Sequence, residues 1–176
     1  MGEVLKMSEN QESKFNMGVL TVSDTGASGE RVVDGSGNAI CEIMAGEGYA
    51  LAVRGLVADE VSQISEKLRE WCDGGGVDLI LTTGGTGLGP RDVTPEATRA
   101  VLDIEAPGIG EAMRMQTLQF TPFAMLSRAT AGVRSGCLIV NLPGSEKAVR
   151  ETLAVAMPAL VHGLEMIRGW RTHDVP

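Results

Sequence analysis

Apolar residues follow two alternating patterns along this chain: short continuous runs, and longer segments in which they recur every three or four positions. The short runs predict strands at Met17–Ser23, Tyr49–Val57, Val77–Thr83, Met125–Val133 and Cys137–Leu142, of which the first is expected to be buried and the third is the clearest core strand. The segments with helical spacing predict helices at Asn38–Glu47, Glu60–Asp73 and Gly108–Gln119, one starting at Thr94, and one from Ser145 to Met157.

Local signals mark where two of these helices begin. Thr94 is a favourable N-cap, and Pro95 suits the first helical position. Ser145 is expected to cap the last helix, in which Pro158 either opens a new helix or kinks the old one before it continues to Ile167.

The order of these elements predicts the fold class. Helices long enough to cross between strands imply a mostly parallel sheet that is covered on both faces. We therefore expect an α/β fold, a single three-layer α/β/α domain with a mostly parallel central sheet. It is expected to span residues 17–169, between a flexible polar leader (1–16) and a tail (170–176).

Composition narrows the functions open to this domain. A formal net charge of −8, without a Lys/Arg-rich run, argues against nucleic-acid binding. The 3 cysteines are widely spaced, which argues against a disulfide framework and a zinc site. Met1–Lys14 has no apolar signal segment and no long apolar run follows, so we expect a cytoplasmic protein without a membrane span.

Three loops at predicted strand ends carry groups that bind phosphate. They are Ser23-Asp24-Thr25-Gly26, the glycine-rich loop from Gly84 to Asp92, and Asn141-Leu142-Pro143-Gly144-Ser145. Glycines at such positions let the backbone approach a ligand closely. Because the carboxyl ends of parallel strands meet at one edge of a sheet, we expect the three loops to converge.

The loop from Gly84 to Asp92 has the most complete set of groups for phosphoryl chemistry. Its glycine N–H groups suit phosphate oxygens, Arg91 could offset developing charge, and Asp92 could bind Mg²⁺. The loop matches neither a Walker loop nor a dinucleotide-binding glycine motif. A tight strand-to-helix turn with an acid near the helix start explains the general pattern equally well.

Other polar residues have both a structural and a functional interpretation. Asp59-Glu60 lies at the end of a strand and the start of a helix, where N-capping explains a carboxylate and a metal or catalytic role is the alternative. Asp24 is similar, but its loop is richer in glycine, which gives function more weight. Ser127 and Arg128 either bind an anion or form a solvated strand end.

Longer motifs around these loops carry a resemblance to a known family. They are Leu20-Thr21-Val22-Ser23-Asp24, the run from Leu81 through Arg91-Asp92 to Thr98, Ala106-Pro107-Gly108, Ala124-Met125-Leu126-Ser127-Arg128 and Asn141-Leu142-Pro143-Gly144. On these motifs the chain, over about residues 18–169, resembles the molybdopterin adenylyltransferase family. This is the MogA/MoaB group, which includes the G domains of plant and animal molybdenum-cofactor enzymes.

The resemblance implies transfer of AMP from ATP to the terminal phosphate of molybdopterin, with Mg²⁺ as cofactor and pyrophosphate as the leaving group. By position, Asp92 and Asp59 would be the catalytic acids, with Mg²⁺ held by Asp92. The nucleotide phosphates would bind to Ser23, Asp24, Gly84, Gly85, Thr86, Gly87, Pro143, Gly144 and Ser145. Molybdopterin itself would contact Arg91, Ser127 and Arg128.

The resemblance also implies a homo-oligomer, a trimer or a hexamer of two trimers, and a downstream metal-insertion enzyme as partner. Two other functions stay open at this point. A non-catalytic molybdopterin-binding or scaffold protein would keep the pterin loops without needing Asp92 beside the glycines. An unrelated nucleotide-binding α/β domain would bind ATP without selecting the pterin.

Overall fold

A computed structural model of the chain describes residues 15–169. The expected tail and nearly all of the expected leader lie outside the described residues. Phe15 and Asn16, which the prediction placed in the leader, belong to the folded part: Phe15 is buried, and strand β1 begins at Asn16.

The sheet has six strands in the order β2-β1-β3-β6-β5-β4. The first four strands in this order run parallel, which confirms the mostly parallel sheet; they are β2 (Ala50–Val57), β1 (Asn16–Val22), β3 (Leu79–Thr83) and β6 (Cys137–Leu142). Strands β5 (Ala131–Arg134) and β4 (Ile104–Glu105) continue the sheet in antiparallel pairing. Strand β4 was not predicted from the sequence.

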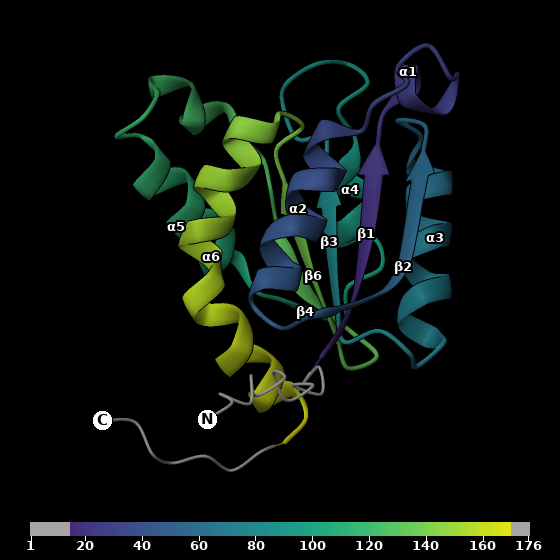
Figure 1. Cartoon of the computed structure of the whole chain (residues 1–176), viewed down its shortest axis with the longest axis vertical. Coiled ribbons are helices and arrows are strands. Elements are labelled where there is room, and N and C mark those ends of the chain that lie inside the picture. The colour runs from purple at the N-terminus through teal and green to yellow at the C-terminus, as the bar shows by residue number, and fades with distance from the viewer. Residues whose placement is uncertain (1–14, 170–176) are drawn as a thin grey trace, which may run out of the picture.

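Helices cover both faces of the sheet, which confirms the three layers. One face packs against α2 (Gly35–Gly46), α5 (Pro107–Thr117) and α6 (Glu146–Ile167), and the other against α3 (Val61–Asp73) and α4 (Thr94–Arg99). Figure 1 shows α2 in front of the sheet and α4 behind it. Within residues 15–169, no helix combines the length and the apolar character that a membrane span needs.

Alternate residues of the central strands enter the two cores. Along β1, Met17 and Val19 pack on the α2 and α6 side, whereas Leu20 and Val22 pack on the α3 side. This is why the strand reads as a continuous apolar run. Trp71 of α3 lies against β1 and β2, where a Cβ at Gly18 would come within 3.0 Å of its ring.

The predicted strand Met125–Val133 was wrong over its first two thirds. Thr121 accepts a hydrogen bond from the N–H of Phe123, and Pro122 opens the 3-10 helix η1 (Pro122–Leu126). Met125 and Leu126 are exposed, so their apolar run does not mark a buried strand. Strand β5 starts only at Ala131.

Three helices start at residues that agree only in part with the predicted starts. Thr94 is not the N-cap of α4 but its first residue, and its hydroxyl donates to the carbonyl oxygen of Gly84 at 2.9 Å. Helix α2 starts three residues earlier than predicted, because Asp34 caps it by accepting from the N–H of Gly37. Ser145 is confirmed as the cap of α6, and Pro158 lies inside that one helix.

Candidate active site at the carboxyl edge of the sheet

The loops after β1, β3 and β6 converge, as expected from the parallel pairing. In register, Thr21 lies beside Thr83, and Thr83 beside Leu142, so the three strands end side by side. A pocket of about 220 Å³, which we call the edge pocket, opens between the loops. It is lined by Thr21, Val22, Ser23, Arg31, Ser36, Asp59, Thr83, Gly84, Gly85, Asp92 and Gly144.

Gly84 and Gly85 form part of this pocket in backbone conformations that favour glycine, with φ of 99° and 63°. A Cβ on Gly84 would lie 2.2 Å from the carbonyl oxygen of Val22, and one on Gly85 2.4 Å from Thr94 Oγ1. The N–H groups of Gly85, Thr86 and Gly87 donate to no group of the described residues. This loop therefore offers free backbone donors to an anion.

Asp59 and Asp92 face the edge pocket with one carboxylate oxygen each fixed by the backbone. Asp59 Oδ2 accepts from the N–H of Asp24 at 2.8 Å, and Asp92 Oδ2 accepts from the N–H of Gly89 at 2.7 Å. The Oδ1 atoms of both residues accept no hydrogen bond from residues 15–169. Burial, together with the nearby charges of Asp24 and Asp92, raises the pKa of Asp59.

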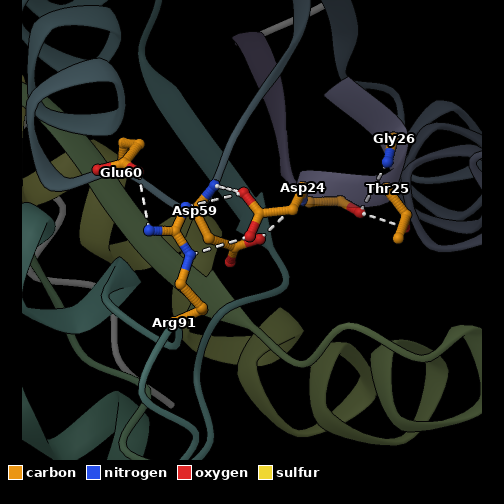
Figure 2. A network of polar contacts seen from close by, with 7 residues as sticks. Asp24, Thr25, Gly26, Asp59, Glu60 and Arg91 are labelled. Atoms are coloured by element: carbon orange, nitrogen blue, oxygen red, sulfur yellow. Dashed lines mark hydrogen bonds and ion pairs between the residues drawn. The ribbon is translucent and has the colours of Figure 1, made fainter. Parts of the chain in front are cut away.

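Arg91 links its own loop to the loops of Asp24 and Glu60, next to Asp59 (Figure 2). Its Nε and Nη2 donate to the two carboxylate oxygens of Asp24, both at 3.0 Å, and its Nη1 lies 2.8 Å from Glu60 Oε1. Asp24 Oδ1 also accepts from the N–H of Asp59. The Arg91 guanidinium and this backbone donor lower the pKa of Asp24.

Arg128 holds the glycine loop in a similar way, from the segment before β5. Its Nε donates to the carbonyl oxygen of Gly87 at 2.7 Å, and its Nη2 donates to the carbonyl oxygen of Asp92. The same guanidinium forms an ion pair with Glu96, and the backbone N–H of Arg128 donates to the carbonyl oxygen of Thr86. The predicted substrate ligands Arg91 and Arg128 are thus both engaged with groups of the protein.

A second cavity, of about 210 Å³, lies between α5, η1 and α6, and its exposed surface is almost entirely apolar. Its lining includes Met113, Phe123, Ser127, Ala129 and Pro143. Because Pro143 is followed directly by Gly144 of the edge pocket, the loop after β6 borders both spaces. We call this second space the apolar cavity.

The predicted site residues therefore divide into three groups. Those that line the edge pocket are Ser23, Asp59, Gly84, Gly85, Asp92 and Gly144. Pro143 and Ser127 line the apolar cavity. Those that line neither space are Asp24, Thr86, Gly87, Arg91, Arg128 and Ser145. Of the pair Asp59-Glu60, for which helix capping was the structural interpretation, Glu60 is at the N-cap position of α3 but makes no side-chain capping hydrogen bond, and the Asp59 carboxylate accepts from the N–H of Asp24 instead.

Sequence reasoning missed Thr21, Arg31, Ser36 and Thr83 as pocket residues. Thr21 and Thr83 end buried strands and have the pattern of core positions. Arg31 belongs to the connection between β1 and α2, and Ser36 is the second residue of α2; both stand in a stretch with the composition of an ordinary polar loop. Only the Asp34 cap before Ser36 could have drawn attention to this segment, because it sets the start of α2 at the pocket.

The expected Mg²⁺ can be compared with the donor atoms at the edge pocket. Within residues 15–169 no cluster of three or more His, Cys, Asp or Glu side chains is arranged to hold a metal ion. Mg²⁺ commonly takes only one or two carboxylates and completes its shell with phosphate oxygens and water. The free oxygens of Asp59 and Asp92 match an ion that arrives with a nucleotide.

Comparison with known proteins agrees with this geometry. The family described as "Probable molybdopterin binding domain" matches residues 18–162. A molybdopterin adenylyltransferase of Helicobacter pylori strain J99 is 43% identical over 159 residues, which cover 88% of this chain and 89% of that protein. Gephyrin of Dictyostelium discoideum is 41% identical over 97% of this chain, which spans 25% of gephyrin.

Solved structures show the same likeness. The molybdopterin biosynthesis enzyme MoaB of Thermus thermophilus is 53% identical, with a TM-score of 0.83 over 88% of this chain and 97% of that one. The tungsten cofactor synthesizing protein MoaB of Pyrococcus furiosus is 34% identical, with a TM-score of 0.79 over 88% of this chain and 97% of its own. The chain therefore belongs to the family of molybdopterin binding domains found in molybdenum-cofactor biosynthesis proteins.

Proposed function

We propose that this protein is a molybdopterin adenylyltransferase, which transfers AMP from ATP to the terminal phosphate of molybdopterin and releases pyrophosphate. One observation carries the proposal. Asp59 and Asp92 each present a free carboxylate oxygen to a pocket bordered by glycines whose neighbouring N–H groups are also free. A protein that only binds the pterin has no need for this pair of acids.

In this reaction an oxygen of the pterin phosphate bonds to the α-phosphorus of ATP, and the bond from that phosphorus to the pyrophosphate oxygen breaks. No covalent enzyme intermediate is needed, so the protein acts mainly by positioning and charge. Mg²⁺, when bound to Asp92 and Asp59, supplies positive charge that reduces the repulsion between the two phosphates. The free N–H groups of Gly85 to Gly87 support the nucleotide phosphates.

The apolar cavity is the proposed place of the pterin. A flat heterocycle suits its apolar surface beside Phe123, and Ser127 supplies a hydroxyl at its wall. Pro143 borders the apolar cavity and Gly144 borders the edge pocket. The two substrates would therefore meet at this loop. We assign Arg91 and Arg128 to holding the glycine loop, since protein groups already occupy their guanidinium donors.

The proposal includes a homo-oligomer, a trimer or a hexamer of two trimers, which passes its product to a metal-insertion enzyme. Exposed apolar side chains gather on α5, on η1 and between them, and would suit a contact between copies; they are Met115, Leu118, Phe120, Phe123, Met125 and Leu126. Sedimentation equilibrium of the purified protein measures the number of copies.

A single-turnover assay with ATP, Mg²⁺ and molybdopterin tests the reaction. Wild type should form adenylylated pterin and pyrophosphate in equal amounts. Asp92→Asn keeps the size of the side chain but removes its charge, and we expect it to slow the transfer at least about 100-fold. Asp103→Asn is the matched control, because Asp103 is an exposed acid outside both spaces.

Three other results of this assay would contradict the proposal in different ways. Tight pterin binding by wild type without any adenylylated product would replace the proposal with the scaffold function. ATP binding that shows no preference for molybdopterin as acceptor would point to an unrelated nucleotide-binding domain. An Asp92→Asn variant as fast as Asp103→Asn would remove Asp92 from the chemistry.

A further inference from the structure

Two arginines on the loops around the edge pocket already have protein partners. Arg91 is held by Asp24 and Glu60, and Arg128 by Glu96 and two backbone carbonyls. An arginine whose donors are satisfied in this way must exchange partners before it can bind a substrate anion. Neither residue lines the edge pocket.

Arg31 differs from both. It lines the edge pocket, its side chain is exposed, and its guanidinium has no hydrogen bond or ion pair with the described residues. Among residues 15–169, it is the one cationic side chain in the lining of this pocket. The sequence motifs gave no weight to it.

The backbone around Arg31 is anchored although its side chain is free. The N–H of Arg31 donates to the carbonyl oxygen of Thr25 at 2.9 Å, which fixes the residue beside α1 (Asp24–Ala27). Three residues later, Asp34 caps α2 and bonds to Arg54 and Thr21. The segment is therefore held on both sides, which keeps the guanidinium near the pocket.

The charge of the pocket favours such a cation for the proposed substrate. Asp59 and Asp92 are the charged groups on the opposite loops, and both would repel a phosphate chain. A guanidinium presents several donors in a planar fork that matches phosphate oxygens. We propose that Arg31 binds the phosphate chain of the nucleotide and so acts as a substrate-binding residue that the family motifs do not include.

The proposal rests on the proposed function for the identity of its ligand, but its test needs no turnover. Isothermal titration calorimetry would measure the dissociation constant of ATP with Mg²⁺, without pterin, for wild type, Arg31→Ala, Arg31→Lys and Arg99→Ala. Arg99 is an exposed arginine of α4 outside the pocket, and its side chain has no partner among the described residues. Arg99→Ala therefore removes the same charge elsewhere.

We expect Arg31→Ala to weaken ATP binding about tenfold or more, as the loss of a charged hydrogen bond implies. Arg31→Lys should recover part of the affinity, and Arg99→Ala should stay within about twofold of wild type. All variants should melt at the wild-type temperature, because both arginines are exposed. A loss in Arg31→Ala no larger than in Arg99→Ala would overturn the assignment.

The outcomes separate this inference from the proposed function. If Arg31→Ala loses ATP affinity while wild type forms no adenylylated pterin, Arg31 keeps its assignment and the transferase proposal fails. If wild type transfers AMP and Arg31→Ala binds ATP normally, the transferase stands and the Arg31 assignment fails. A wild type that binds no ATP would overturn both.

Discussion

At the scale of single residues, Asp59 has opposite effects on function and stability: metal binding uses its ionised form, and folding disfavours that form. Burial and the charges of Asp24 and Asp92 raise its pKa, so the folded protein disfavours the ionised carboxylate that a metal would need. An acid with a raised pKa binds protons more readily in the folded state. Its contribution to stability is therefore present at low pH and is lost as the pH rises through the folded pKa.

Asp59→Asn should separate the effect of this carboxylate on stability from its effect on AMP transfer. The amide keeps an oxygen that can accept from the N–H of Asp24 but removes the unfavourable charge. At pH 7 we expect a melting temperature equal to or above that of wild type, and AMP transfer slowed at least about 100-fold. The gap between the melting curves should narrow as the pH falls and Asp59 of the wild type becomes protonated. Calorimetry measures the melting temperature, and the single-turnover assay measures the rate of AMP transfer. A variant that melts below wild type, or that transfers AMP at the wild-type rate, would contradict these roles of Asp59.

The partners of Arg91 and Arg128 are a second feature at the scale of single residues. The motifs pointed to Arg91 and Arg128, and the structure does place both at the glycine loop. The structure also shows contacts that a motif does not reveal. The guanidinium groups of both residues donate to Asp24, Glu60, Glu96 and backbone carbonyls. A residue type and its position predict where a charge lies, but not which neighbours it meets.

At the scale of elements, the start of α2 is fixed by one side chain. Asp34 Oδ1 accepts from the N–H of Gly37 at 2.9 Å, and Oδ2 accepts from Thr21 and from Arg54 at 2.6 and 3.0 Å. Burial alone would raise the pKa of Asp34, but these donors outweigh it and lower the pKa. The cap thereby joins α2 to β1 and β2 beside the edge pocket.

Asp34→Ala should destabilise the protein by about 1–2 kcal/mol through loss of the cap alone. Because the pKa of Asp34 is lowered in the folded state, its contribution is present above the unfolded pKa and is lost as the pH falls through the folded pKa. Urea unfolding at pH 7 and at lower pH would show a difference from wild type that shrinks on acidification. Glu111→Ala, at an exposed acid whose side chain has no partner among the described residues, is the control. An equal effect in the two variants would refute the role of Asp34.

Secondary structure could be predicted from the sequence mainly where an element is buried on two faces. The strands β1, β3 and β6 read as continuous apolar runs because alternate residues enter the two cores. The run at Met125 and Leu126 misled, since both side chains are exposed on a 3-10 turn. Strand β4 has two residues and both are exposed, so it leaves no apolar pattern.

At the scale of the whole molecule, the topology gathers charge at one edge. Parallel strands end there, and α2, α3 and α6 begin there (Figure 1). Helix N-termini attract anions, whereas Asp59 and Asp92 attract cations, so the edge favours a metal and a phosphate chain together over either one alone.

Saturating Mg²⁺ and ATP should therefore stabilise the folded protein jointly. At about 100 times the dissociation constant, ligand binding adds about 2.7 kcal/mol, which raises the melting temperature of a domain of this size by about 5–10 °C. Thermal denaturation with ATP plus EDTA, and with Mg²⁺ alone, should give much smaller rises. A rise of the same size in EDTA would show that the nucleotide binds without the metal.

The sequence by itself determined the three-layer fold, the convergence of the three loops and most of the residues in the edge pocket. Apolar periodicity and strand ends are local properties, and parallel pairing follows from them by simple rules of connection. Only the tertiary structure decided which charges are free: Arg91 and Arg128 are engaged, whereas the Oδ1 atoms of Asp59 and Asp92, and Arg31, have no partner within residues 15–169. The physical reason is that partners such as Asp24 and Arg91, 67 residues apart, meet only when the chain is folded.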